Sequence, residues 1–183
     1  MRRVAFGVGL TLLALVFALA FNTARLPKAS AAAARENLPT LDEAALAARL
    51  AGAIRIPTIS HEDRARIDTA AFIELSAYLE TQFPRVHRTL AREAVAGHSL
   101  LYRWAGSDAQ AMPALLLAHL DVVPVEPGTE GQWQHPPFSG AIADGYIWGR
   151  GTLDDKSSAV AWLEAVETLL ASGYAPARTL YLA

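Results

Sequence analysis

The hydrophobic positions of the chain begin with one continuous apolar run, residues 4–21, which follows Arg2 and Arg3. A run of this length lies near the lower limit for crossing a bilayer. Positive charge before it favours an N-terminus in the cytoplasm and export of the residues that follow. The pattern therefore predicts a hydrophobic helix within residues 1–21, which is either a retained signal anchor or a cleaved signal peptide.

The two interpretations of this first segment differ in where the mature chain would begin. Small residues at 29–32 are a candidate cleavage region, although they lie some way past the apolar run. The run is also longer than the usual core of a signal peptide, which favours the anchor. Both interpretations place the rest outside the cytoplasm, either membrane-anchored or, after cleavage, secreted or periplasmic. Residues 22–40, with Pro27 and a run of alanines, are predicted to be a linker.

Two segments after this linker carry apolar residues at helical spacing. The first covers residues 43–54, and Thr40 with Glu43 fits a capping box at its start. The second covers residues 67–83 and is stopped by Pro84. The sequence therefore predicts two consecutive helices before any strand.

The remaining apolar residues occur mostly in short runs that are typical of strands. The predicted strands cover residues 86–94, 99–104, 114–118 and 178–183, with a small hairpin over 141–148. A further helix is predicted over residues 156–172, ahead of the last strand. This order predicts an α/β sheet domain over residues 41–183. In such sheets ligands bind beyond the carboxyl ends of the strands.

The composition narrows the chemistry that the chain can support. Sixteen basic and eighteen acidic residues give a formal charge of −2, so a nucleic-acid partner is not indicated. Cysteine is absent, which excludes disulfides, thiolate nucleophiles and zinc–thiolate sites. A metal ion would have to be held mainly by His, Asp and Glu side chains.

A candidate site of that kind lies where the 114–118 strand is predicted to end. His119 and Asp121 are two positions apart, so a continued strand would point both the same way. A carboxylate beside an imidazole fixes its tautomer and leaves the other ring nitrogen free for a metal. Asp154, just ahead of the 156–172 helix, is positioned to reach a metal held by His119 or to bridge two ions. These groups suit zinc, and also cobalt or manganese.

Plainer interpretations compete with this one. A His-x-Asp sequence is common by chance, and an acidic pair before a helix more often caps it than binds a metal. Lys156 is expected either at the surface or in contact with Asp121 or a substrate. The residues taken one at a time leave these alternatives open.

Several ordered motifs favour the metal site. They are Ala53–Ser60, His119–Pro124, Pro137–Gly140 and Gly149–Lys156, the last reading Gly-Arg-Gly-Thr-Leu-Asp-Asp-Lys. With the N-terminal hydrophobic segment, they resemble the M20 family of metallopeptidases. The match is closest to the carboxypeptidase S branch, which includes N-fatty-acyl-amino-acid synthase/hydrolase. The resemblance covers roughly residues 41–183.

The resemblance implies an α/β/α zinc-peptidase domain that hydrolyses peptide or N-acyl-amino-acid amide bonds at a two-zinc site. By position, His119 would bind one zinc, Asp154 would bridge both, and Asp121 would orient His119. The family's general-base Glu, its other ligands and its lid domain have no counterpart here. The chain is therefore expected to be an N-terminal part of the catalytic domain without the lid. Alone, it is expected to be inactive and to bind zinc poorly.

Two alternative functions remain open from the sequence. An aminopeptidase or deacetylase of the same fold would share these motifs, because specificity in the family depends on the lid. A membrane-anchored, non-catalytic module that binds a peptide or a protein partner would share the N-terminal helix and the domain without the reaction. The oligomeric state and the substrate side chain are not indicated by any pattern in the sequence.

Overall fold

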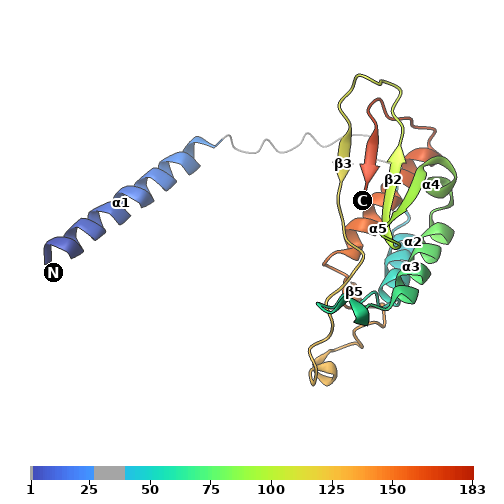
Figure 1. Cartoon of the computed structure of the whole chain (residues 1–183), viewed down its shortest axis with the longest axis horizontal. Coiled ribbons are helices and arrows are strands. Elements are labelled where there is room, and N and C mark those ends of the chain that lie inside the picture. Colours follow the sequence, from blue (N-terminus) through green and yellow to red (C-terminus); the bar gives the residue numbers. More distant parts are fainter. Residues whose placement is uncertain (1, 27–39) are drawn as a thin grey trace. The chain divides into compact units, whose positions relative to one another are not determined.

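A computed structural model describes residues 2–26 and 40–183 of the chain (Figure 1). The chain divides into two units, Met1–Pro39 and Thr40–Ala183. Most of the linker expected at residues 22–40 falls outside the described residues, as does the whole candidate cleavage region at 29–32.

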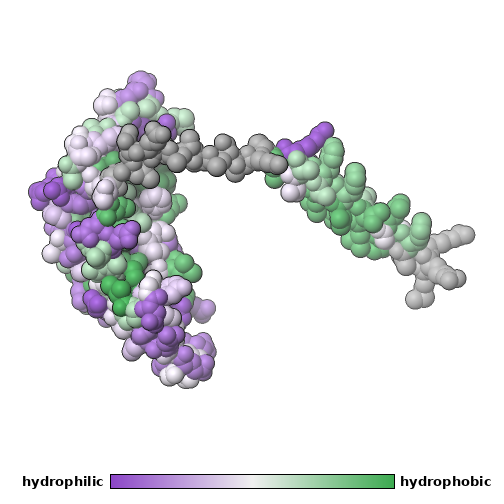
Figure 2. Space-filling model, turned by 180° about the vertical axis from the view of Figure 1, so that it is seen from behind, coloured by the Kyte–Doolittle hydropathy of each residue, from purple (hydrophilic) through white to green (hydrophobic). Residues whose placement is uncertain are grey.

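The first unit contains one long helix, α1 (Arg2–Arg25), which confirms the predicted N-terminal hydrophobic helix. Its side chains from Phe6 onward are exposed to solvent. Figure 2 shows hydrophobic residues along the visible face of this helix. The stretch Phe6–Arg25 is long and apolar enough to cross a membrane, and a signal sequence would have the same properties.

The second unit is built on a four-stranded mixed sheet in the order β1-β2-β6-β3. Strands β1 and β2 form an antiparallel hairpin, β2 and β6 are also antiparallel, and β6 runs parallel to β3. A separate small hairpin joins β4 and β5 about Asp144-Gly145, as predicted. The strands are β1 (Ala91–Val95), β2 (Ser99–Trp104), β3 (Ala114–Leu116), β4 (Ala141–Ala143), β5 (Tyr146–Trp148) and β6 (Leu180–Leu182).

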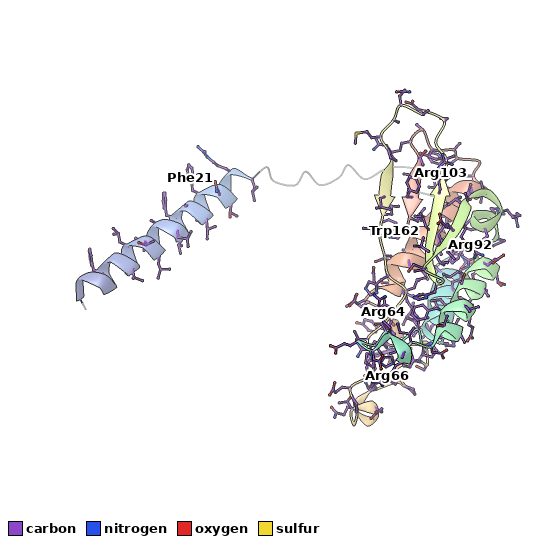
Figure 3. The ribbon with its side chains drawn as sticks, in the orientation of Figure 1. Phe21, Arg64, Arg66, Arg92, Arg103 and Trp162 are labelled. Carbon is purple, nitrogen blue, oxygen red and sulfur yellow. The ribbon has the colours of Figure 1, made fainter. Side chains whose placement is uncertain are left out.

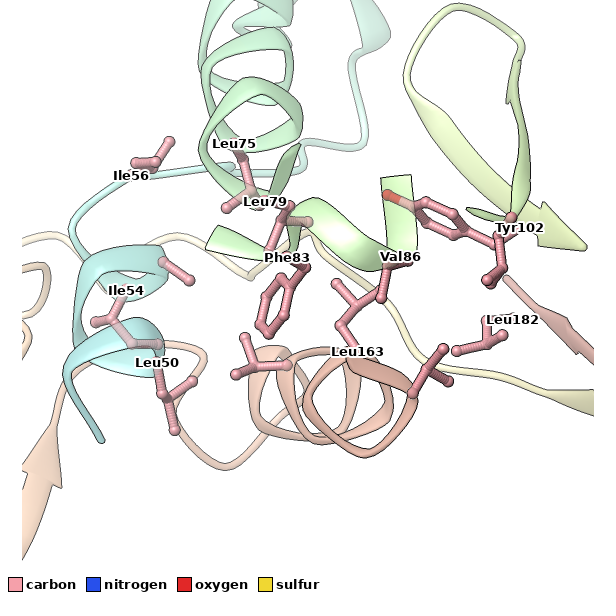
Figure 4. Packing of buried hydrophobic residues seen from close by; sticks show 14 of the residues in the cluster. Leu50, Ile54, Ile56, Leu75, Leu79, Phe83, Val86, Tyr102, Leu163 and Leu182 are labelled. Carbon is pink, nitrogen blue, oxygen red and sulfur yellow. The ribbon is translucent and has the colours of Figure 1, made fainter. Parts of the chain in front are cut away.

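Helices pack against one face of this sheet and enclose the core. Val86 and Leu163 from the helices, with Phe83 between α3 and α4, share this core with Tyr102 and Leu182 from paired positions of β2 and β6 (Figure 4). Burial of these apolar side chains is the main source of the domain's stability. The helices are α2 (Glu43–Ile54), α3 (Thr69–Gln82), α4 (Pro84–Thr89) and α5 (Lys156–Ala171), with short 3₁₀ turns η1 (Arg64–Arg66) and η2 (Glu130–Gln132). The α/β class predicted from the sequence is confirmed.

The prediction of a strand over residues 86–94 is wrong for the first half of that range. Residues 84–89 form helix α4 instead, and the strand begins only at Ala91. Proline is favoured in the first turn of a helix, where its missing N–H is not needed. The buried Glu167 carboxylate on α5 accepts hydrogen bonds from the backbone N–H groups of Arg85 and Val86, both at 2.9 Å. This long-range cap has no signature in the local sequence.

The cap of α2 also differs from the prediction. Asp42, rather than Thr40, is the N-cap residue, and its carboxylate accepts a hydrogen bond from the Ala45 N–H at 3.0 Å. Both residue types are good N-caps, so the pattern alone could not choose between neighbouring positions.

Candidate metal centre

His119 and Asp121 lie just beyond the carboxyl end of β3. The pairing continues past Leu116, because the Ala118 N–H donates to the Ala183 carbonyl at 2.9 Å. The chain then turns so that His119 Nδ1 lies 3.0 Å from the Asp121 carbonyl oxygen and 3.3 Å from its carboxylate Oδ1. The structure therefore brings the two residues together, but through this turn of the chain and not through the continued strand geometry on which the prediction relied.

Asp154 reaches the same point from a loop that precedes α5. Its Oδ1 lies 2.8 Å from His119 Nε2, although the two residues are 35 positions apart. The Asp154 side chain is 87% exposed and that of His119 is 48% exposed. The peptide bond between Asp154 and Asp155 is cis. One imidazole and one carboxylate thus converge on a position open to solvent.

The protons at this contact determine what it can bind. When neutral His119 carries its proton on Nδ1 and donates a hydrogen bond to the Asp121 carbonyl oxygen, Nε2 carries a lone pair directed at the Asp154 carboxylate, which is also an acceptor. Two acceptors 2.8 Å apart need a proton or a cation between them. Burial lowers the pKa of His119, but hydrogen bonds to Asp121 and Asp154 and their negative charges outweigh it, so the pKa is raised above its ordinary value.

The donor set fits a divalent cation such as zinc. An imidazole nitrogen and a carboxylate oxygen are both common zinc ligands, and a carboxylate behind the imidazole is the usual support. Zinc sites normally use at least three protein ligands. Among residues 2–26 and 40–183, no three or more His, Asp or Glu side chains come together in this way. His119 and Asp154 by themselves thus offer fewer ligands than a zinc site normally uses.

A short segment after α2 supports the His119 side of the site. The Thr58 hydroxyl donates to the Leu120 carbonyl at 2.5 Å, and the Val122 N–H donates to the Thr58 carbonyl at 2.9 Å. Ile59 and Val122 form an isolated parallel bridge. The local sequence does not reveal this support, because Thr58 and Leu120 are 62 residues apart.

Lys156 supports the Asp154 side, contrary to its predicted surface or Asp121-binding position. It is the first residue of α5 and is fully buried. Its Nζ donates to the carbonyls of Ala53 at 2.9 Å and Ile56 at 2.6 Å. Burial lowers its pKa to about 8. The last carbonyls of a helix lack partners within it and carry partial negative charge, so the end of α2 attracts this ammonium group.

A largely apolar cavity of about 730 Å³ adjoins the site. His119 and Asp121 contribute to its wall, and so do Arg64 and Trp162, which Figure 3 labels. Most other side chains in the wall are apolar, among them Phe72, Leu79, Leu100, Leu117 and Leu163, and the polar ones include Ser60, His98 and Ser99. A bound molecule at the site would therefore have room for an apolar group nearby.

Known proteins share this region of the chain. Residues 115–183, which include His119, Asp121 and Asp154, match the model of peptidase family M20/M25/M40. Probable carboxypeptidase S-like 2 of Dictyostelium discoideum is 44% identical over 150 residues, covering 81% of this chain and 28% of that protein. N-fatty-acyl-amino acid synthase/hydrolase of Xenopus tropicalis is 44% identical over 135 residues, covering 73% of this chain and 26% of that protein.

A solved structure supports the same relationship. The M20 family metallo-carboxypeptidase of Sulfolobus solfataricus superposes with a TM-score of 0.56 at 25% identity, over 78% of this chain and 30% of that one. The chain therefore spans less than a third of the length of each of these proteins. In both fold and sequence this chain is therefore similar to M20 family peptidases, among them carboxypeptidase S-like proteins and N-fatty-acyl-amino acid synthase/hydrolases.

Proposed function

We propose that the full-length protein containing this chain is a zinc-dependent hydrolase of peptide or N-acyl-amino-acid amide bonds, of the carboxypeptidase type. The main observation behind this proposal is the 2.8 Å approach of His119 Nε2 to Asp154 Oδ1 with Asp121 behind the imidazole. The homology to M20 peptidases supports the same reaction class.

Each of the three residues has a defined task in this proposal. His119 would hold one zinc ion, and the carboxylate of Asp154 would be shared between two ions. Asp121 would accept a hydrogen bond from the His119 Nδ1–H through its carbonyl oxygen, with its carboxylate 3.3 Å away, which keeps the His119 tautomer correct and its ring in place. When bound, zinc polarises the scissile carbonyl and lowers the pKa of a bound water. Cobalt or manganese could replace zinc at such ligands. The remaining ligands and the general base come from other parts of the full-length protein.

The cavity beside His119 bears on the substrate. Its apolar wall supports a substrate that carries an apolar side chain or an acyl chain next to the amide bond. One relative is named for a carboxypeptidase activity and another for an N-fatty-acyl-amino acid hydrolase activity, so the names point to two substrate classes. Both classes of substrate therefore belong in one test.

Helix α1 bears on the location of the protein. A helix that is apolar over Phe6–Arg25 supports either membrane anchoring or export, with the catalytic domain outside the cytoplasm. The substrates would then be extracellular or periplasmic small molecules rather than proteins inside the cell.

The deciding experiment measures hydrolysis of dipeptides and N-acyl amino acids by the full-length protein. We expect activity that a chelator removes and added zinc restores, and that His119→Ala abolishes. His61→Ala is the matched control and should leave the activity unchanged. Full activity of His119→Ala, or of the chelated protein, would contradict the proposal. Binding of the same compounds without turnover would instead favour a non-catalytic binding module.

A further inference from the structure

Lys156 is an unusual residue for its position in the fold. It is fully buried, and the two acceptors of its ammonium group are neutral carbonyl oxygens, those of Ala53 and Ile56. Burying a charge is unfavourable unless its hydrogen bonds are satisfied, and an apolar side chain would fill the same space without that penalty. A residue of this kind at the start of α5, directly after the loop that carries Asp154, therefore suggests a role beyond filling the core.

The backbone of Lys156 also determines the shape of that loop. Its N–H donates to the Gly151 carbonyl at 3.1 Å, which closes the turn that contains Asp154. The stem of the Lys156 side chain packs over Gly151, so that a Cβ atom added to Gly151 would lie 3.5 Å from Lys156 Cδ. Lys156 thus joins the Asp154 loop to the end of α2.

Thr58 makes the corresponding link on the other side of the site. It is fully buried and lies two residues after Ile56, which accepts from Lys156. Its hydroxyl and carbonyl bind the backbone of Leu120 and Val122, directly after His119. A continuous set of hydrogen bonds therefore runs from the Asp154 loop, through residues 56–58, to the backbone that carries His119.

We propose that Lys156 is a positioning residue that fixes the separation of His119 and Asp154 for metal binding, acting through residues 56–58. The inference rests on the proposed zinc site. Ligands held in place before the metal arrives bind it more tightly, because less order has to be imposed on binding. Loss of the Lys156 ammonium would release the Asp154 loop from α2 and let the two ligands separate.

Glu167 provides a matched control for simple destabilisation. It is a second buried charged residue of α5, and it caps the start of α4 much as Lys156 caps the end of α2. Its hydrogen bonds lead to Arg85 and Val86 rather than to the site. Lys156→Met and Glu167→Met both replace a buried charge at a helix end by the same apolar side chain, so both should lower the melting temperature.

The experiment measures the zinc affinity of the full-length protein by competition with a chromophoric chelator, together with the melting temperature of the metal-free form. We expect Lys156→Met to weaken zinc binding by roughly 10–100-fold, the range found for residues that orient metal ligands. Glu167→Met should leave the affinity within about twofold of wild type. Thr58→Val, which removes only the hydroxyl bond to Leu120, should weaken binding in the same direction as Lys156→Met.

The outcomes separate the two proposals. Wild-type protein that binds no zinc would overturn both the proposed function and this inference. Tight wild-type binding with unchanged affinity in Lys156→Met would overturn only the positioning role. Equal losses in Lys156→Met and Glu167→Met would also overturn it, because the effect would then follow stability. If Lys156→Met does not fold, Thr58→Val decides, and an unchanged affinity in that variant would refute the inference.

Discussion

Gly151 lies directly against the side chain of Val122, so that a Cβ atom built on Gly151 would approach Val122 Cγ1 to 2.6 Å. This contact joins the loop that carries Asp154 to the segment that follows His119. Gly151 also has a φ of +89°, a backbone conformation that residues with a side chain rarely adopt. The close approach of the two halves of the site thus depends on a glycine at this position.

Gly151→Ala should destabilise the protein more than the backbone conformation alone explains. Gly97, in the turn between β1 and β2, has a similar φ of +93° but nothing within 4 Å of a built Cβ. Gly97→Ala therefore measures the strain of the conformation, about 1–2 kcal/mol. We expect Gly151→Ala to lower the free energy of unfolding by about 1–3 kcal/mol more, through overpacking against Val122. The measurement is urea denaturation of both variants. Equal losses of unfolding free energy in Gly151→Ala and Gly97→Ala would contradict the prediction, because the loop would then move away from Val122 at little cost.

Asp121→Asn should reduce hydrolysis while leaving the fold intact. The hydrogen bond from Nδ1 to the Asp121 carbonyl oxygen remains, but the amide beside Nδ1 carries no negative charge, so the orientation and basicity of His119 are weakened. We expect about a 10–100-fold loss in activity or zinc affinity. Asp144→Asn, in the exposed β4–β5 turn, is the control, because asparagine tolerates the positive φ of that position. Unchanged hydrolysis kinetics in Asp121→Asn would show that the Asp121 carboxylate has no role in the site.

The sequence predicted the elements whose signals are local. Periodic apolar positions located α2, α3 and α5, and Asp144-Gly145 located the small hairpin. The apolar run before His119 predicted a strand that ends just ahead of it, although the contact of His119 with Asp121 arises from a turn and not from continued strand geometry. Each of these features depends on residues within a few positions of one another, which is the range that propensity and periodicity report.

The features that the sequence did not predict depend on distant partners. Residues 86–89 are helical because Glu167 caps them from another helix, and nothing near Pro84 indicates that contact. Lys156 is buried because the end of α2 supplies two carbonyl acceptors about a hundred residues earlier in the chain. A lysine beside two aspartates otherwise suggests a solvated ion pair. Tertiary contacts of this kind override local preference.

Tyr102 should make the protein sensitive to alkaline pH. Burial raises its pKa above the ordinary value of 10, against the opposing effect of Arg92. The folded protein therefore keeps the Tyr102 proton at a pH where the unfolded chain has lost it. The contribution of the protonated Tyr102 to the free energy of unfolding is fully present below pH 10. It is lost as the pH rises through the pKa of Tyr102 in the folded protein, by up to about 1.4 kcal/mol per pH unit.

The measurement is the free energy of unfolding between about pH 8 and about pH 11, a range that spans the ordinary tyrosine pKa. Tyr102→Phe should remove part of the decline above about pH 10. Tyr146→Phe is the control, since that side chain is 68% exposed and should change nothing. An identical decline in wild type and Tyr102→Phe would mean that other groups cause it.

Helix α1 should determine where the protein is found. A charge at the centre of a membrane helix is unfavourable by about 2.5–3.5 kcal/mol, so Leu13→Arg should reduce membrane association or export, while Leu13→Phe should not. Fractionation of cells that express the full-length protein checks this. The N-terminal sequence of the mature protein separates an anchor, which keeps residues 1–21, from a cleaved signal. A full-length protein that stays soluble in the cytoplasm would contradict both the anchor and the cleaved-signal interpretation.

Asp154→Asn should lower the amount of zinc that the full-length protein retains. An amide carries no charge and bridges two cations poorly, so one of the two proposed ions should be lost and the other weakened. Asp155→Asn is the matched control, because Asp155 is the adjacent N-cap residue of α5 and its side chain makes no capping hydrogen bond. Metal analysis after dialysis should give about half the wild-type zinc content, or less, for Asp154→Asn and the wild-type content for Asp155→Asn. The reverse order would assign the bridging carboxylate to Asp155, and equal contents in all three proteins would exclude both residues as ligands.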